Sequence, residues 1–177
     1  MRVVAGSHRG RTLRAPRGDQ TRPTSDRVRE ALFSMLGDDV EDARVLDLFA
    51  GSGALGIEAL SRGAAAAVFV DSAAAAISVI NENLRALGLE GTVARMPAIR
   101  ALGCAPVGGR EYDLVFIDPP YRLASELGPA LSAALPALLA PGAKVVTESD
   151  RRNPLALDLP LQRERRYGDT LIRIHVA

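Results

Sequence analysis

Several residue types are scarce in this chain of 177 residues, and each shortage excludes a class of protein. The sequence has one cysteine, two histidines and no tryptophan. A lone cysteine, Cys104, excludes an intramolecular disulfide and a cysteine-rich metal cluster, and we expect no metal site. No apolar run is long enough to span a bilayer, and the charged start of the chain is unlike a signal peptide. Length and composition therefore agree with a single domain, which we expect to be cytoplasmic and to have no membrane partner.

Positive charge is concentrated at the start of the chain. Residues 1–29 hold eight arginines and two acidic residues, a net charge of +6, whereas the rest holds fourteen basic and nineteen acidic residues, a net charge of −5. Arginine is the default base of this chain, which has one lysine, Lys144, but that preference does not explain the clustering. A basic arm on an acidic body is typical of a protein that contacts a polyanion, and guanidinium groups suit irregular RNA. The residues expected to contact RNA are Arg2, His8, Arg9, Arg11, Arg14, Arg17 and Arg22.

The first 22 residues are predicted to form a basic extension of a main domain that covers residues 23–177. Met1–Ala5 and Arg11–Ala15 flank the segment GSHRG, so the pattern predicts a hairpin with His8 and Arg9 exposed at its tip. A flexible arm that becomes ordered only on binding is the alternative. Pro16–Pro23 is the expected hinge.

A helix is predicted directly after this hinge. Thr24 or Ser25 can cap its start, and Gly37 should end it. Its expected apolar face is made by Val28, Ala31, Leu32 and Met35.

A glycine-rich turn between a strand and a helix marks a ligand site. Residues 44–56 (RVLDLFAGSGALG) are typical of a strand, a turn and a helix start, and the helix should end at Gly63. Gly51 and Gly53 let the backbone turn sharply and leave room for a ligand beside the N–H groups of the helix start. Together with Gly56 their spacing also matches the dinucleotide fingerprint, so the turn alone does not decide the cofactor.

Two acidic residues narrow the choice of cofactor. Asp47 precedes the turn, where a carboxylate would repel a pyrophosphate but attract the ammonium and sulfonium groups of S-adenosylmethionine. Asp71 ends the next predicted strand, twenty positions after Gly51, where a carboxylate can accept both ribose hydroxyls of either cofactor. Asp71 could also cap the helix predicted over residues 73–87, and the two roles are compatible.

The segment Asp118-Pro119-Pro120-Tyr121 is the strongest candidate for a catalytic loop. It follows YDLVFI (residues 112–117), a predicted buried strand. The two prolines fix the backbone and cannot continue a regular element, so the loop presents a carboxylate, a free carbonyl and an aromatic ring. These groups can hold a planar base and orient its exocyclic amine. For the segment alone, a strand-end turn with Tyr121 covering the core is the alternative.

In this order, DLFAGSG (47–53), Asp71 and DPPY (118–121) resemble the motifs of class I S-adenosylmethionine-dependent amino-methyltransferases. Residues 2–11 (RVVAGSHRGR) and 22–33 (RPTSDRVREALF) are similar to those of the bacterial 16S rRNA guanine-N2 methyltransferases, and the resemblance covers nearly the whole chain. It implies methyl transfer from S-adenosylmethionine to the N2 amine of a guanine in 16S rRNA, within the small ribosomal subunit or its assembly intermediate. S-adenosylhomocysteine is then the product, the N-terminal hairpin helps to recognise rRNA, and a monomer is the simplest expectation.

The resemblance also implies residue roles. The expected catalytic residues are Asp118, Pro119, Pro120 and Tyr121, and the expected cofactor contacts are Thr24, Asp47, Ala50, Gly51, Gly53, Asp71, Pro97, Ala98 and Asp118. Met96-Pro97-Ala98 departs from the family, which usually has an acidic or amide residue before the alanine to contact the adenine amine. Pro97 cannot make that contact, but the N–H of Ala98 can still serve adenine N1, so we expect cofactor binding with one contact altered.

The rest of the sequence alternates strands and helices, which predicts an α/β doubly wound sheet. Leu123–Leu139 should be a helix interrupted by prolines, closed by Pro141-Gly142. The predicted strands beyond the glycine turn and Asp71 are Thr92–Arg95, Ala143–Glu148 and a C-terminal hairpin of Leu161–Tyr167 and Thr170–Val176. The resemblance implies a Rossmann-like class I methyltransferase fold with a seven-stranded, mostly parallel sheet, flanking helices and one antiparallel strand near the C-terminus.

Three other functions fit parts of the sequence. An adenine-N6 methyltransferase of DNA or RNA shares DPPY, but DNA enzymes of this kind usually carry a target-recognition segment. The 64 residues between Gly53 and Asp118 are needed for two α/β units, which leaves no room there for such a segment. A nicotinamide-dependent dehydrogenase leaves DPPY unused. A non-catalytic RNA-binding ribosome assembly factor explains the basic arm but not the glycine turn. DPPY accepts amines of different bases in different enzymes, so guanine rests on the resemblance.

Overall fold

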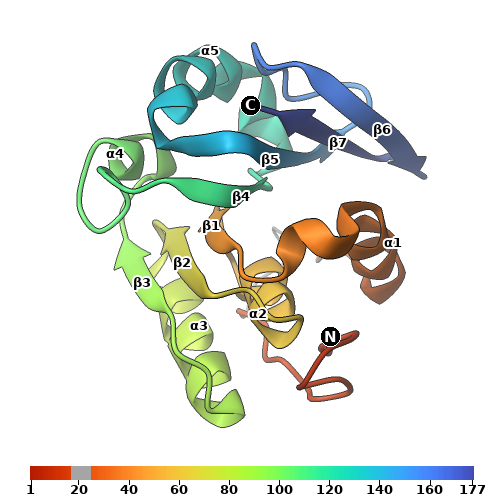
Figure 1. Cartoon of the computed structure of the whole chain (residues 1–177), viewed down its shortest axis with the longest axis vertical. Coiled ribbons are helices and arrows are strands. Elements are labelled where there is room, and N and C mark those ends of the chain that lie inside the picture. Colours follow the sequence, from red (N-terminus) through yellow and green to blue (C-terminus); the bar gives the residue numbers. More distant parts are fainter. Residues whose placement is uncertain (17–24) are drawn as a thin grey trace.

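A seven-stranded sheet forms the centre of the computed structural model, which describes residues 1–16 and 25–177, with the backbone alone at residues 121 and 125 (Figure 1). Its strands are β1 (Arg44–Leu48), β2 (Ala66–Asp71), β3 (Thr92–Arg95), β4 (Tyr112–Ile117), β5 (Leu139–Asp150), β6 (Leu161–Tyr167) and β7 (Thr170–Val176). They lie in the order β3-β2-β1-β4-β5-β7-β6. Neighbours from β3 to β5 pair in parallel, and β7 runs antiparallel to both β5 and β6. The mostly parallel sheet with an antiparallel strand near the C-terminus is therefore confirmed.

Helices cover both faces of this sheet. They are α1 (Asp26–Leu36), α2 (Ala54–Ser61), α3 (Ala74–Leu87), α4 (Ala98–Leu102) and α5 (Ala124–Ala134), with short 3-10 helices η1 (Gly37–Val40), η2 (Tyr121–Leu123) and η3 (Leu135–Leu138). One apolar cluster joins the sheet to α1, α2 and α3 through Phe33, Ile57 and Ile80. A second cluster joins the other face to α4 and α5 through Leu102 and Leu131. Because β1, β2 and β4 are covered on both faces, most of their residues are apolar and buried.

Close packing explains the third glycine of the predicted turn motif. A Cβ added to Gly56 would lie 2.3 Å from Cε1 of Phe69 on β2, which is far inside van der Waals contact. Only glycine therefore lets α2 approach the sheet this closely, and Gly56 serves helix–strand packing rather than a ligand.

The predicted boundaries hold for several elements and differ for two, the helix over Leu123–Leu139 and the strand over Ala143–Glu148. Ser25 caps α1 through a 3.3 Å bond from the N–H of Val28, and Gly37 and Gly88 end α1 and α3. The helix expected over Leu123–Leu139 is interrupted as predicted at Pro136 but not at Pro129, which lies inside α5, and η2 and η3 form its two ends. Pro136 lies in the first turn of η3, where its missing N–H costs no helical bond. β5 begins at Leu139, so Pro141 and Gly142 lie inside a strand, where the β4–β5 pairing shifts register.

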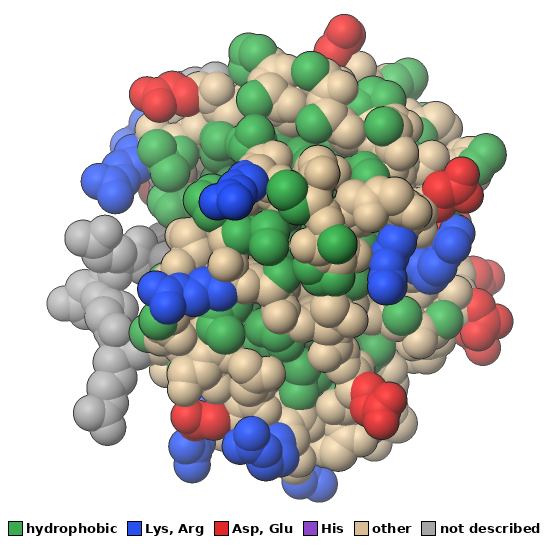
Figure 2. Space-filling model, turned by 90° about the vertical axis from the view of Figure 1, so that its left-hand side faces the viewer, with side chains coloured by type: hydrophobic (Ala, Val, Ile, Leu, Met, Phe, Trp, Pro, Cys, Tyr) green, Lys and Arg blue, Asp and Glu red, His purple; other side chains and the backbone are tan. Residues whose placement is uncertain are grey.

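The surface beside β3, α3 and α4, on the left in Figure 1, has mixed charge. Figure 2 shows basic and acidic side chains interspersed there among apolar and neutral ones. Such a surface has no strong field of one sign that would attract a polyanion. Among the helices of residues 1–16 and 25–177, none is long and apolar enough to cross a membrane.

Candidate active site

The carboxyl ends of β1, β2, β3 and β4 meet at one edge of the sheet. Leu48 of β1 pairs with Val70 of β2 and with Ile117 of β4, so these strands end at the same level. The segments that follow the four strands therefore lie side by side and contain the glycine turn, Asp71, Pro97 and Asp118. The strand order changes direction between β1 and β4, which is where open parallel sheets bind ligands. The fold thus gathers the candidate cofactor and catalytic residues at one edge.

Residues 49–53, here called the cofactor loop, form a tight turn with three left-handed residues. The φ angles are 62° at Phe49, 57° at Gly51 and 77° at Gly53. The N–H of Ala50 donates to the carbonyl of Val70 at 3.0 Å, and that of Gly53 to the carbonyl of Ala50 at 2.7 Å. Within the described residues, a Cβ added to Gly51 would meet only the carbonyl of Phe49, at 3.9 Å, so this part of the loop faces open space. A left-handed bulky residue such as Phe49 is rare, and such strain concentrates at ligand sites.

Asp47 is buried beneath the cofactor loop, with 1% of its surface exposed. Its Oδ2 accepts a hydrogen bond of 2.9 Å from the N–H of Gly56 in the first turn of α2. Burial raises the pKa of Asp47 from 3.8 to about 7; the bond from Gly56 opposes this rise, and the negative charge of Asp71 adds to it. Asp47 therefore orients the start of α2, and a cation placed beside it would favour its ionised form.

Asp71 joins the cofactor loop to the start of α3. Its Oδ2 accepts the N–H of Gly51 at 2.9 Å, and its Oδ1 accepts the N–H of Ala73 at 2.8 Å. The predicted capping role is therefore present, and the carboxylate also fixes the loop. Each carboxylate oxygen has two lone pairs, so Asp71 retains acceptor capacity for two further donors.

Asp118 lies half-buried at the end of β4, the strand that pairs with β1, and Asp47 lies on β1. Burial raises its pKa well above 3.8, and the negative charges of Glu148 and Asp47 raise it further. Glu148 is 5% exposed and lies on β5, the next strand in the sheet. Pro119 is buried, which fixes the backbone after Asp118. The side chain of Tyr121 lies outside the described part of the chain, so its role stays a prediction.

The segment expected to meet adenine follows β3. Pro97 is exposed and precedes α4, whose first residue is the buried Ala98. The N–H of Met96 donates to the carbonyl of Asp71 at 3.1 Å, which ties this segment to the end of β2. The N–H of Ala98 belongs to the first turn of a helix and needs a partner outside it.

Residues 1–16, here called the N-terminal arm, form a hairpin. Arg2 and Thr12 make an antiparallel bridge, and the N–H of Val3 donates to the carbonyl of Arg11 at 2.9 Å. The hairpin is held against α2, because Glu58 accepts the N–H groups of Val4 and Ala5 at 2.7 and 2.9 Å. The arm is thus docked along its described length.

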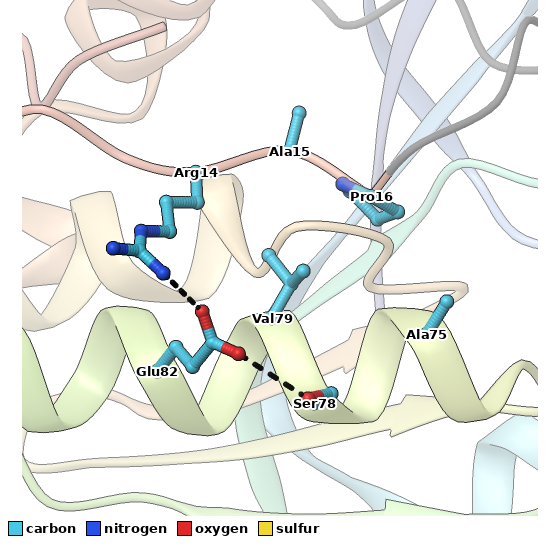
Figure 3. Close-up of a pocket in the computed structure, with 7 residues that line it drawn as sticks. All are labelled: Arg14, Ala15, Pro16, Ala75, Ser78, Val79 and Glu82. Atoms are coloured by element: carbon cyan, nitrogen blue, oxygen red, sulfur yellow. Dashed lines mark hydrogen bonds and ion pairs between the residues drawn. The ribbon is translucent and has the colours of Figure 1, made fainter.

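The end of the arm lies over α3, as Figure 3 shows. Asn83 accepts the N–H of Arg14 at 2.9 Å, and its amide donates to the carbonyls of Arg14 and Ser52, both at 3.0 Å. Glu82 pairs with Arg14 at 2.7 Å beside a cavity of about 730 Å³ between the arm and α3. Because Ser52 belongs to the cofactor loop, Asn83 connects the arm to that loop directly.

The predicted RNA contacts differ in exposure. Arg9 and Arg11 are exposed, and the side chains of Arg2 and Arg14 are 68% and 76% exposed although each is paired with a carboxylate. His8 is half-buried rather than exposed, because its Nε2 lies 3.1 Å from the carbonyl of Leu87 and its N–H donates to Ser61. Predictions for Arg17, Arg22 and Thr24 fall outside the described residues.

Three residues of the site were missed by sequence reasoning: Phe49, Asn83 and Glu148. The left-handed backbone of Phe49 has no sequence signal, since bulky residues rarely adopt it. Asn83 did carry one, because it is a polar residue on the buried face of α3, next to Leu84. Glu148 carried one too, as an acidic residue near the end of a predicted buried strand.

Comparison with known proteins places the chain in a family. A sequence profile of the family described as Conserved hypothetical protein 95 matches residues 1–176. Ribosomal RNA small subunit methyltransferase D of Escherichia coli K12 is 43% identical over 122 residues, which cover 69% of this chain and 61% of that protein. The chain belongs to the small-subunit rRNA methyltransferase D family.

Two further relatives of this family match over almost their whole length. YlbH of Bacillus subtilis (strain 168) is 41% identical over 182 residues, covering 99% of this chain and 98% of YlbH. The solved structure of yhhF from Escherichia coli has a TM-score of 0.84 at 37% identity, covering 99% of this chain and 97% of that one. The expected class I methyltransferase fold is thereby confirmed, and family membership excludes the dehydrogenase alternative.

Proposed function

We propose that the protein transfers a methyl group from S-adenosylmethionine to the exocyclic N2 amine of a guanine in 16S rRNA, within the small ribosomal subunit or an assembly intermediate. The observation that carries this proposal is the position of Asp118 and Pro119, which follow β4 directly beside β1 and the cofactor loop. The name of the Escherichia coli relative specifies rRNA of the small subunit, and YlbH is named as a candidate rRNA methyltransferase. Guanine and its N2 amine follow from the resemblance of residues 2–11 and 22–33.

The residues at the sheet edge fit S-adenosylmethionine. Gly51 borders open space beside the N–H groups of α2, and Asp47 would attract the positive charges of the cofactor. The remaining lone pairs of Asp71 would accept the ribose hydroxyls, and the N–H of Ala98 would serve adenine. When bound, S-adenosylmethionine supplies a methyl group on a positively charged sulfur. The remaining proposed contacts are Thr24, Ala50, Gly53, Pro97 and Asp118.

Asp118 and Pro119 would orient the target amine. An aromatic amine is a weak nucleophile because its lone pair is delocalised into the ring. The Asp118 carboxylate and the Pro119 carbonyl would each accept one N–H, which favours a pyramidal nitrogen with its lone pair directed at the methyl group. The nitrogen loses one proton for the methyl group it gains, and Asp118 or water accepts that proton. The two prolines hold this geometry and Tyr121 would stack on the base, so positioning supplies most of the rate enhancement.

The catalytic role of Asp118 is tested by complementation of a strain that lacks the gene. Asp118→Ala removes the acceptor for the amine, so we expect loss of N2-methylguanosine from 16S rRNA, measured by mass spectrometry. Affinity for S-adenosylhomocysteine, measured by calorimetry, should stay within about threefold of wild type, since the cofactor loop is untouched. Asp113→Ala is the matched control, because Asp113 lies on the same strand but binds the backbone N–H of Arg44 at the opposite end.

Each alternative function has its own outcome in this experiment. Loss of N6-methyladenosine instead of N2-methylguanosine would identify an adenine methyltransferase. Unchanged methylation in the deletion strain would favour a non-catalytic assembly factor. Wild-type turnover of Asp118→Ala would contradict the proposed role of the loop.

A further inference from the structure

The acidic body of the protein contains a second basic segment near the C-terminus. Residues 151–173 hold six arginines and three acidic residues, a net charge of +3, whereas residues 30–150 hold eight basic and sixteen acidic residues, a net charge of −8. The excess of arginine is therefore confined to the two ends of the sequence. The arginines of the C-terminal segment are Arg151, Arg152, Arg163, Arg165, Arg166 and Arg173.

The strand pairing brings part of this segment to the same edge as Asp118. Ile117 pairs with Thr147, so Asp118 lies beside Glu148, and β5 ends two residues later at Asp150. Arg151 and Arg152 follow at once, about 10 Å beyond Glu148 at the rise of an extended strand. Asp150 pairs with Thr170, which brings the β6–β7 turn to this edge too.

These arginines lie on the opposite side of Asp118 from the cofactor. The cofactor loop, Asp71 and Pro97 follow β1, β2 and β3, whereas β5, β7 and β6 continue the sheet in the other direction. The β5-β7-β6 side is therefore the side of Asp118 that lies away from the proposed cofactor contacts, and a polymer that delivers a base to Asp118 can pass over it.

The guanidinium groups are exposed and outnumber their carboxylate partners. The side chains of Arg151, Arg152 and Arg166 are 51%, 72% and 70% exposed. Asp169 pairs with both Arg151 and Arg152, at 3.2 and 3.4 Å. One carboxylate shared by two arginines orients them, and a second carboxylate, that of Asp150, accepts the backbone N–H of Arg152 at 2.8 Å. Exposed ion pairs of this kind are weak, so a phosphate can compete for either guanidinium.

We infer that Arg151, Arg152, Arg165 and Arg166, here called the C-terminal basic surface, bind the phosphate backbone of the substrate RNA beside the methylated nucleotide. This inference rests on the proposed function and adds a second contact to that of the N-terminal arm. Contacts to phosphate fix the register of the RNA and carry no base preference. The surface therefore positions the RNA while the pocket at Asp118 selects the base.

Arg151→Gln/Arg152→Gln tests the surface with unmethylated small subunits from the deletion strain. The dissociation constant should rise on the order of tenfold at 0.15 M salt. The slope of the logarithm of the binding constant against the logarithm of the salt concentration should fall by about 1.4, because each lost contact to a phosphate lowers it by about 0.7. KM for the subunit should rise while kcat stays within about twofold. Affinity for S-adenosylhomocysteine should be unchanged, which also reports an intact fold.

Arg44→Gln/Arg110→Gln is the matched control, since it removes two exposed arginines next to carboxylates at the amino edge of β1 and β4. Arg165→Gln/Arg166→Gln should repeat the effect on the other half of the surface. Wild-type subunit affinity and salt slope in both variant pairs, or equal losses in the control, would overturn the inference. If the wild-type protein neither binds nor methylates the subunits, the proposed function fails instead.

Discussion

At the scale of single residues, Asp47 is a buried carboxyl group whose ionised form is unfavourable. It is 1% exposed, and its Oδ2 accepts the backbone N–H of Gly56. Removal from water outweighs that bond, so the pKa of Asp47 rises to about 7. A carboxyl held in this way is destabilising when it ionises, and a positively charged ligand beside it would relieve that cost. Relief of this unfavourable charge would contribute to the binding free energy of a cationic cofactor.

Asp47 predicts a specific dependence of stability on pH. Between about pH 4 and 7 the folded state retains a proton that the unfolded state has lost, so the free energy of unfolding falls as pH rises through this window. The group alone contributes on the order of 4 kcal/mol across it. Asp47→Asn keeps an acceptor for Gly56 but does not titrate, so urea unfolding should show a flatter profile and a more stable protein at pH 8. Asp113→Asn is the control, and an equally steep fall in Asp47→Asn would contradict the prediction.

The places of the proposed cofactor contacts in the fold were predictable from the sequence where they depend on position along a strand. Asp71 ends β2 and Asp118 directly follows β4, and parallel pairing brings such ends together whatever the side chains in between. What each atom binds was not predictable in the same way. Asp47 stays a predicted cofactor contact, and its bond to Gly56 was not foreseen because that contact depends on how closely α2 packs on β2.

At the scale of elements, Asn83 connects three parts of the protein. From α3 it bonds the backbone of Arg14 in the N-terminal arm and the carbonyl of Ser52 in the cofactor loop. It is 3% exposed, so these groups have little access to water as replacement partners. The arm and the cofactor loop therefore share a single buried side chain.

Asn83→Ala should loosen the arm and destabilise the protein. Loss of the amide leaves buried backbone groups without partners, which costs about 1–3 kcal/mol in the free energy of unfolding, measured with urea. Hydrogen exchange at the N–H of Arg14 should accelerate. Asn81→Ala is the matched control on the same helix, because Asn81 is exposed and, within residues 1–16 and 25–177, its side chain bonds the carbonyl of Ile77 alone, and it should change stability by less than about 0.5 kcal/mol. Equal effects of the two substitutions would show that Asn83 makes no special connection.

Elements with a strong local signal were predicted well, and elements defined by their neighbours were not. Gly88 ends α3 in a left-handed conformation as the pattern indicated, and Thr92–Arg95 and the C-terminal hairpin have the predicted bounds. The region after Asp118 differs from the prediction because β5 begins four residues earlier, at Leu139, which pairs with Tyr112 of β4. This pairing joins residues that are far apart in the sequence. The docking of the arm was likewise invisible, since Glu58 and Asn83 gain that role only when the helices pack together.

At the scale of the whole molecule, the distribution of charge matches two separate contacts with one polyanion. The first 29 residues carry a net charge of +6, residues 151–173 carry +3, and the part between residues 30 and 150 carries −8. The N-terminal arm packs on α2 and α3, whereas the C-terminal basic surface belongs to the opposite end of the sheet order at β6 and β7. An acidic body between two basic surfaces repels RNA elsewhere and would favour one orientation on the substrate.

This arrangement predicts that the two surfaces contribute independently to subunit binding. Arg9→Gln/Arg11→Gln in the arm and Arg151→Gln/Arg152→Gln in the C-terminal basic surface alter side chains that share no partner in the described structure. Free energies of such separate sites add within about 0.5 kcal/mol, so the quadruple variant should lose affinity by the product of the two fold-changes. Subunit binding measured across a series of salt concentrations should also show the slope reductions adding together. A quadruple variant that binds no more weakly than one of the pairs would mean that the RNA contacts these surfaces one at a time.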